Sequence, residues 1–383
     1  METRLNIPQI TRAIKSHGFT YSALAKCMDV QPAAVTQWLN GETKPLAHRL
    51  LKLSLLLDLS FDDMLVNEEA FPPAPIVAYR KVAGKTTTEH EIEKAVEKGR
   101  LLRPLAKYLP NQLIRPAAFR DPSTDYEYLQ HAARDLRKDL GLSEYSKIGY
   151  SDLIGKFNEL EAVIIPVMWG KREAHGNALH ILLPESGATW IYLNLDSNAC
   201  DFNFWMAHEL AHVYTPALAG SDAGEDFAEA FAGALLFPQA CATKLYHDIN
   251  GKRSSTVVSA IKSAAIERTI SVYTVVKALN TYAQAHKLKG LNEFRSSLFG
   301  ATKNVEKLFP TISEILFEKG KPDADVFISS TEEAFYTPIY DILRDYLLES
   351  AHGAGWLAEM MDISVIDAQA LYKALTAKMA TKN

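Results

Sequence analysis

No run of about 18 uncharged apolar residues occurs in this sequence of 383 residues, and its start, METRLNIPQI, lacks the apolar stretch of a signal peptide. These absences argue against membrane insertion and against export, so we expect a cytoplasmic protein with no membrane partner. Cysteine is also scarce: Cys27, Cys200 and Cys241 lie far apart, and no Cys-x-x-Cys pair occurs. A disulfide framework and a thiolate metal site are therefore disfavoured.

Charge is distributed unevenly along the chain. Charged residues make up 23% of the sequence and hydrophobic residues 48%, which is usual for a globular protein, and the formal net charge is -5. Residues 1–57 nevertheless hold seven Lys and Arg against three Asp and Glu, a balance of +4. A mildly acidic protein therefore begins with a basic module.

Hydrophobic periodicity and turn residues divide the chain into four segments. We expect a helical module in residues 1–70, a linker with a basic, solvated helix in residues 71–125, and helices around a small sheet in residues 126–250. The β-rich runs of that third segment are AVIIPVMW, ALHILLP and ATWIYLNLD. The pattern in residues 251–383 predicts helices. No motif there indicates a chemical role, and none is assigned. The expected fold class is mostly helical α+β.

The first segment carries a helix-turn-helix pattern. Pro32 is expected in the first turn of one helix, which Asn40-Gly41 then stops. The stretch SALAKCMDVQPAAVTQWLNGETKPL resembles the Cro/CI-type (XRE) helix-turn-helix family, which implies an all-helical domain that binds an operator in double-stranded DNA. The alternative is a small helical domain for protein interaction, against which the positive charge weighs.

The resemblance implies that the second helix of the motif enters the major groove with its N-terminal part. The residues expected to face bases are Gln31, Ala33, Thr36 and Gln37, and those expected to contact phosphate are Lys44 and Arg49. Because few of these side chains discriminate strongly between bases, we expect a homodimer on two half-sites.

A His-Glu-Leu-Ala-His pentad lies in the third segment. On an α-helix His208 and His212 project from nearly the same face and can both bind one ion, while Glu209, about 100° round, can reach the open side of that ion. Two neutral imidazoles suit a catalytic Zn²⁺, and the carboxylate can act as general base toward water. The pentad by itself is short enough to occur by chance.

A third ligand is expected from the following helix. Glu225 lies 13 residues after His212, across a turn rich in Pro, Gly and Ser, and small residues beside it, Ala232 and Gly233, favour close approach of the two helices. Glu229, one turn on, is expected to accept the outer N–H of a ligating His. The alternative for both glutamates is a solvated surface.

Other polar residues near the pentad are weaker candidates. Asp226 is expected to face solvent, and Asp222 to cap its helix. His175 and His180 lie on or beside a strand, where they would point to opposite faces, and are interpreted as a loop residue and a partly buried strand residue rather than ligands.

If such a site hydrolyses peptides, it must also hold its substrate. The strand TWIYLNLD precedes the His-containing helix, and its edge is a candidate for pairing with an extended peptide, with Tyr192 and Asn194 as candidate binding residues. Tyr214, Tyr192 or a His remain open as donors to an oxyanion.

Residues 126–240 resemble the ImmA/IrrE family of zinc metallopeptidases, through HELAH at 208–212 and EDFAEAFAGALLFP at 225–238. The resemblance implies a thermolysin-like zincin fold, Zn²⁺ bound by His208, His212 and Glu225, and Glu209 as general base. It also implies a protein substrate, often a helix-turn-helix repressor.

Two functions follow as hypotheses. The first is a DNA-binding, regulatory zinc metalloendopeptidase that cleaves a repressor or another partner protein, with cleavage of its own linker near residues 70–90 as one option. The alternative is a transcriptional regulator or antitoxin-like repressor whose zincin-like domain senses a ligand or partner without catalysis. Glu209 favours the enzyme, since a sensor needs no general base. Three protein ligands leave a position open, which disfavours a purely structural zinc site.

Overall fold

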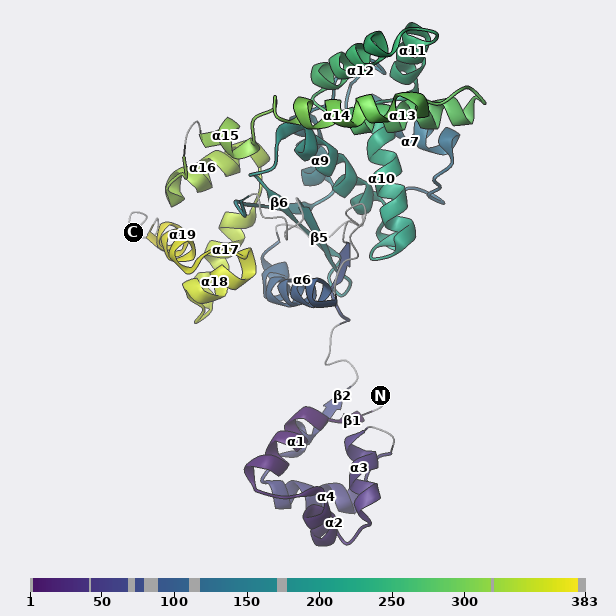
Figure 1. The fold of residues 1–383 in the computed structure, drawn as a ribbon. Helices are drawn as coiled ribbons and strands as arrows, with labels where there is room; N and C mark the ends of the chain where they lie inside the picture. Colours follow the sequence, from purple (N-terminus) through teal and green to yellow (C-terminus); the bar gives the residue numbers. More distant parts are fainter. Residues whose placement is uncertain are drawn as a thin grey trace. The chain divides into compact units, whose positions relative to one another are not determined.

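The structure is a computed structural model that describes residues 3–40, 43–67, 73–78, 89–109, 118–170, 178–317 and 320–377 (Figure 1). Contacts divide the chain into two compact units, Met1–Pro73 and Ala74–Asn383. Helices dominate, and the larger unit contains a small four-stranded sheet, so the mostly helical α+β class is confirmed. Among the described helices, none has both the length and the apolar character needed to cross a membrane.

The first unit is a bundle of short helices closed by a two-stranded ribbon. Its elements are β1 (Thr3–Leu5), α1 (Ile7–Ser16), α2 (Tyr21–Met28), α3 (Pro32–Leu39), α4 (Ala47–Leu57), α5 (Phe61–Met64) and β2 (Leu65–Asn67). The helices share one core that includes Ile10, Leu24, Val35, Trp38 and Leu57. Since all of these side chains are at most 5% exposed, the unit has a core of its own.

Local signals explain where the helices of this unit begin and end. The Thr20 side chain accepts a hydrogen bond from the N–H of Ala23 and so caps α2. Pro32 begins α3, as the sequence predicts, and Asn40 caps its end. Leu46 precedes α4 and is 62% exposed. Gly41 lies outside the described residues.

The second unit is built on a sheet with the strand order β3-β5-β6-β4. Its strands are β3 (Ile76–Ala78), β4 (Ala162–Val167), β5 (Ala178–Leu183) and β6 (Ala188–Asn194). β4 is parallel to β6, and the other neighbours are antiparallel. The sequence predicts β4, β5 and β6, whereas β3 comes from the segment expected to be a linker. That segment therefore contributes to the sheet of this unit.

Helices cover both faces of the sheet. Those of the first half of the unit are α6 (Glu89–Leu102), η1 (Arg103–Tyr108), α7 (Tyr126–Asp139), α8 (Tyr150–Glu159), α9 (Ala199–Tyr214), η2 (Pro216–Leu218) and α10 (Asp222–Leu236). Ile164, Ile191 and Leu193 belong to the core around α9 and α10. Trp190 and Tyr192 belong to the core on the opposite face. This alternation follows from the period of two in a strand and decides which side chains reach α9.

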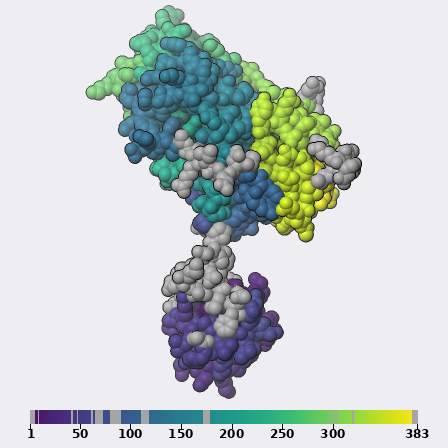
Figure 2. Space-filling model, turned by 180° about the vertical axis from the view of Figure 1, so that it is seen from behind, coloured from purple at the N-terminus to yellow at the C-terminus, as the bar shows by residue number. Residues whose placement is uncertain are grey.

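The remaining helices extend both cores. They are α11 (Gln239–Ile249), α12 (Ser254–Arg268), α13 (Val272–Ala285), η3 (Asn292–Phe294), α14 (Arg295–Glu306), α15 (Ile312–Phe317), α16 (Ala324–Phe335), α17 (Ile339–Glu349), α18 (Ala354–Met361) and α19 (Val365–Ala377). Figure 2 shows the C-terminal helices, in yellow, directly against the blue segment of α6 and η1. The Trp169 indole donates to the carbonyl oxygen of Met361 at 3.0 Å, which joins the end of β4 to α18. Residues after 250 thus help to bury the sheet.

Candidate metal centre

Helix α9 places the two histidines of the pentad inside the second unit. Asn198 caps the helix by accepting from the N–H of Asp201, and almost every residue of α9 is buried. His208 and His212, one turn apart, are each 2% exposed. The ring of Trp205 packs against His208, with 5.5 Å between ring centroids. The helix therefore holds both imidazoles in a packed environment with little rotamer freedom.

The connection from α9 to α10 returns the chain toward the histidines. After the short helix η2, Gly220 adopts φ 71°, a left-handed conformation that glycine adopts without strain. Ser221 then caps α10 by accepting from the N–H of Gly224. A Cβ at Gly224 would lie 2.3 Å from the carbonyl oxygen of Leu218, so only glycine fits there. This tight hairpin is what brings Glu225 back to α9.

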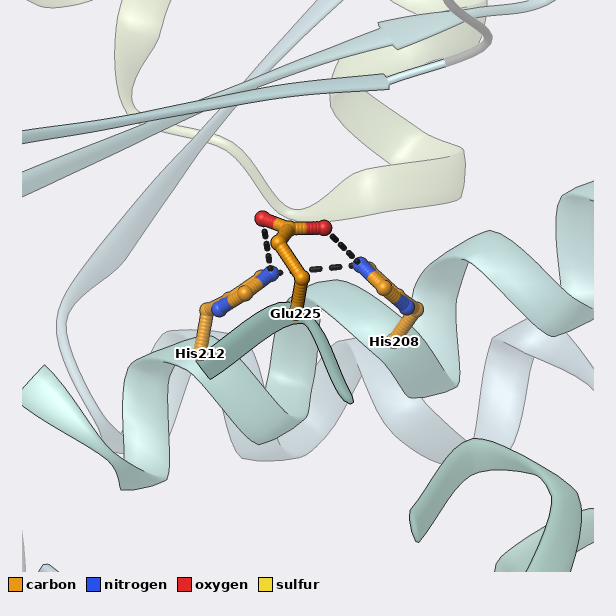
Figure 3. Close-up of side chains that lie close together, drawn as sticks. All are labelled: His208, His212 and Glu225. Carbon is orange, nitrogen blue, oxygen red and sulfur yellow. Dashed lines mark hydrogen bonds and ion pairs between the residues drawn. The ribbon is translucent and has the colours of Figure 1, made fainter. Parts of the chain in front are cut away.

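Three candidate ligand atoms converge at this hairpin (Figure 3). The Nε2 atoms of His208 and His212 are 3.1 Å apart. The carboxylate oxygens of Glu225 lie 3.5 Å from Nε2 of His208 and 3.3 Å from Nε2 of His212. Tetrahedral Zn²⁺ with bonds of the usual length separates its ligand atoms by about 3.3 Å. The three side chains therefore fit a zinc ion without rearrangement.

Burial and unsatisfied polarity also fit a metal ion. Both carboxylate oxygens of Glu225 are buried and have no hydrogen-bond partner within the described part of the chain. Burial alone would raise the pKa of Glu225, but the contacts with His208 and His212 outweigh burial and lower that pKa to about 2. Burial disfavours the charged form of His212, while Glu225 and Glu209 favour it and raise its pKa. The site therefore places a carboxylate beside two imidazoles, a set of groups that could hold a cation.

Two further side chains lie beside His208, His212 and Glu225, which are called the triad from here on. Glu209 is 4% exposed, and its Oε2 lies 3.5 Å from Nδ1 of His180 on β5. His180 is 2% exposed, and its ring centroid lies 5.5 Å from that of His212. Burial lowers the pKa of His180, with Glu209 acting in the opposite direction.

His180 is thus a site residue that the sequence interpretation set aside. Its neighbours Leu179 and Ile181 belong to the opposite core, so the strand period turns His180 toward α9. A polar residue between two apolar ones on a buried strand was the available signal. His175, the other histidine considered, lies outside the described residues.

The expectation for Glu229 is wrong. Its Oε1 accepts from Nζ of Lys277 on α13 at 3.1 Å, so Glu229 faces α13 rather than the histidines. The Nδ1 atoms of His208 and His212 are buried and have no hydrogen-bond partner in the described ranges. Gly233, expected to allow close helix approach, has open space where a Cβ would stand.

The two aspartates near Glu225 stand apart from the triad. Asp226 is exposed, as expected for a residue about 100° round the helix. Asp222 is exposed too and is the first residue of α10, while the cap is Ser221.

The predicted substrate strand is not an edge. β6 pairs with β5 on one side and with β4 on the other, so its backbone has no free side for a peptide. Tyr192 points to the face opposite α9 and donates its hydroxyl to the carbonyl oxygen of Met360 at 2.8 Å. Asn194 bonds through its amide to Trp169 and Gly170. The binding roles predicted for Tyr192 and Asn194 are therefore wrong.

Tyr214, left open as an oxyanion donor, ends α9 and stacks on Phe119, with ring centroids 4.7 Å apart. It is 8% exposed, and burial raises its pKa. The tyrosine thus packs at the helix end.

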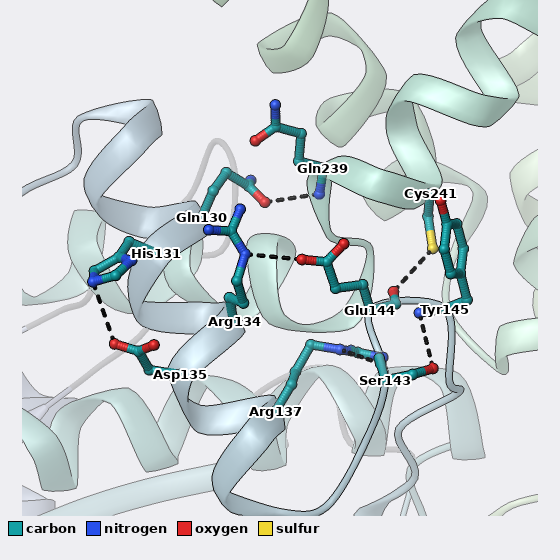
Figure 4. A network of polar contacts seen from close by, with 10 residues as sticks. All are labelled: Gln130, His131, Arg134, Asp135, Arg137, Ser143, Glu144, Tyr145, Gln239 and Cys241. Carbon is teal, nitrogen blue, oxygen red and sulfur yellow. Dashed lines mark hydrogen bonds and ion pairs between the residues drawn. The ribbon is translucent and has the colours of Figure 1, made fainter.

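A surface pocket of about 450 Å³ lies elsewhere, lined by residues of α7 and α11 and of the loop after α7; Figure 4 shows polar contacts among residues around it. Its polar side chains pair with one another: Arg134 with Glu144 at 2.9 Å, and Gln130 with the N–H of Gln239 at 2.8 Å. The buried guanidinium of Arg137 donates to backbone carbonyl groups, including that of Ser143. None of the metal-site side chains lines this pocket.

The residues expected to contact DNA lie at or near α3 and α4 of the first unit. Gln31, Ala33, Thr36 and Gln37 are exposed at or on α3, while Val35 and Trp38 of the same helix are buried. Lys44 is exposed and Arg49 half-buried. The arrangement leaves the N-terminal part of α3 available to a groove.

Comparison with known proteins bears on the first unit. Residues 10–64 match the family described as helix-turn-helix, which confirms the motif predicted there. Searches of curated proteins and of solved structures each found no significant match. The first unit therefore supports a DNA-binding regulator, and the chemistry of the second unit must be argued from its own residues.

Proposed function

We propose that the protein is a DNA-binding regulator whose second unit is a zinc metalloendopeptidase of the ImmA/IrrE type. One observation carries the proposal: His208, His212 and Glu225 present buried ligand atoms at zinc-like separations, with the Glu209 carboxylate beside them. A purely sensory domain has no need of this fourth side chain, a second carboxylate at the site. The triad leaves a position open, as in catalytic zinc sites.

The roles of the residues follow from their positions. His208, His212 and Glu225 hold the ion, which when bound polarises a peptide carbonyl group and lowers the pKa of water. Glu209 accepts a proton from the attacking water and donates it to the leaving amine. His180 lies at ion-pair distance from Glu209 and would help to hold its carboxylate in place.

The helix-turn-helix unit supplies the regulatory part of the proposal. Its exposed α3 residues would bind an operator as a homodimer, and a protein substrate bound at the same operator would be presented at high local concentration. A helix-turn-helix repressor is the substrate class proposed here.

The test compares the wild type with Glu209→Gln on a peptide library prepared from a denatured proteome, with new termini identified by mass spectrometry. The wild type should generate new termini with zinc present, and Glu209→Gln should generate about 10²–10⁴-fold fewer. Asp226→Asn, on an exposed carboxylate near the site, is the matched control and should resemble the wild type. Full zinc occupancy without Glu209-dependent cleavage would leave the sensory alternative.

A further inference from the structure

The edge of the sheet nearest the metal centre carries a short strand from another part of the chain. β5 contains His180, and β3 pairs with β5 in antiparallel register, with Ala78 opposite His180 and Ile76 opposite Leu182. Directly opposed residues of an antiparallel pair point to the same face. Ala78 and Ile76 therefore lie on the face of the sheet from which His180 reaches Glu209.

Two glycines shape the space around β3. A Cβ on Gly220 would lie 3.0 Å from Cγ2 of Ile76, so the connection that carries Glu225 toward the site also borders β3. A Cβ on Gly99 would lie 2.4 Å from Cβ of Pro75, so α6 borders the start of the same segment. β3 thus lies against β5, the α9–α10 connection and α6, and the space that it fills between them is called the channel below.

We propose that this channel is the peptide-binding edge of the second unit, and that β3 occupies it as an internal pseudosubstrate. The inference rests on the proposed function for the nature of the ligand, which is an extended polypeptide. Such a peptide would add to β5 as β3 does, with a small residue opposite His180 and an apolar residue opposite Leu182.

The size and origin of β3 fit a removable occupant. It pairs over three residues, and it follows Pro73, the last residue of the first unit. Short edge strands have few hydrogen bonds to lose and open at low cost. An incoming peptide must displace β3, so its apparent affinity is lowered by the fraction of molecules in which the edge is free.

The experiment traps a peptide at the edge in the expected register. Leu182→Cys provides a thiol on β5 in the full chain, with Cys27→Ser to remove an exposed thiol and Glu209→Gln to prevent cleavage. The probe is a synthetic peptide of residues 73–79 with cysteine in place of Ile76. Its disulfide adduct is measured by intact mass, and a scrambled peptide reports non-specific thiol reactivity.

Releasing β3 from β5 should increase the rate at which the peptide forms the disulfide adduct. Adding Ile76→Asp and Ala78→Asp, which introduce charge into the channel, should raise the rate of adduct formation by about tenfold or more. The matched control, Ile366→Asp, changes a side chain that is 78% exposed and should leave the rate unchanged. Equal rates with and without the β3 charges, or equal trapping of the scrambled peptide, would overturn the proposal. Melting temperature and bound zinc verify that each variant folds.

A locked variant keeps the proposal testable if the charged variant does not fold. Ile76→Cys with Leu182→Cys joins opposed residues, whose Cα separation of about 5 Å suits a disulfide. With Glu209 intact, the oxidised form should lose cleavage of the peptide library and regain it on reduction, whereas undiminished cleavage would refute the channel. Trapping without any Glu209-dependent cleavage would contradict only the proposed peptidase activity. Cleavage without trapping would contradict only the proposed peptide-binding channel.

Discussion

The two units display their candidate functional residues in opposite ways. In the first, Gln31, Ala33, Thr36 and Gln37 are exposed around one helix, and the buried side of that helix only supports it. In the second, the candidate site is buried and combines two helices with a strand. A surface for a groove needs accessible side chains, whereas a zinc site needs ligands held in a dry, fixed arrangement. Changes in the two units should therefore have separable effects.

The largest expected effect is on stability, in a variant that should destabilise the first unit and leave the second unit unchanged. Trp38→Ala removes a side chain that is 5% exposed from the core of the first unit and should cost that unit about 3–5 kcal/mol of stability. Calorimetry of the full chain should show one transition at a lower temperature and the transition of the second unit unchanged. A common shift of both transitions would contradict independent cores.

His180→Phe sharpens the account of the second unit. It removes the group 3.5 Å from the Glu209 carboxylate and leaves the three proposed ligands intact. We expect full zinc content and a peptide-cleavage rate reduced by about 10–100-fold, mainly in kcat. Loss of zinc in this variant would instead make His180 a ligand.

Gln37→Ala addresses the exposed helix of the first unit. Binding to a duplex selected by the wild type from randomised DNA should weaken by about 1–3 kcal/mol, because the exposed side chain is expected to contact bases rather than the core. Fluorescence anisotropy measures the affinity, and the melting temperature should stay unchanged. Unchanged affinity for the selected duplex would remove Gln37 from the interface.

The smallest effect concerns Glu229. Lys277→Met removes its partner at the half-exposed surface of α13 and should change stability by no more than about 1 kcal/mol. Zinc content should be unaffected, as measured by plasma mass spectrometry. Reduced zinc would restore the role beside the histidines that the structure denies to Glu229.

The sequence predicts those features of the fold and site whose residues lie close together in the chain. The helix-turn-helix motif and the pentad are contiguous, so spacing and capping predict them, and Glu225 lies only one hairpin away. The pairing of β6 on both sides and the position of β3 depend on strands far apart in the chain. No local pattern encodes that order, which is why β6 was predicted to offer a free edge with Tyr192 as a binding residue, and why His180 was set aside.

The most direct test of the metal centre is bound zinc, measured by plasma mass spectrometry on the purified full chain. The account predicts about one zinc per chain in the wild type, in Glu209→Gln and in the matched control Asp226→Ala, with zinc lost in Glu225→Ala. Absence of zinc from the wild type after expression with zinc supplied, or equal zinc in Glu225→Ala and Asp226→Ala, would contradict it.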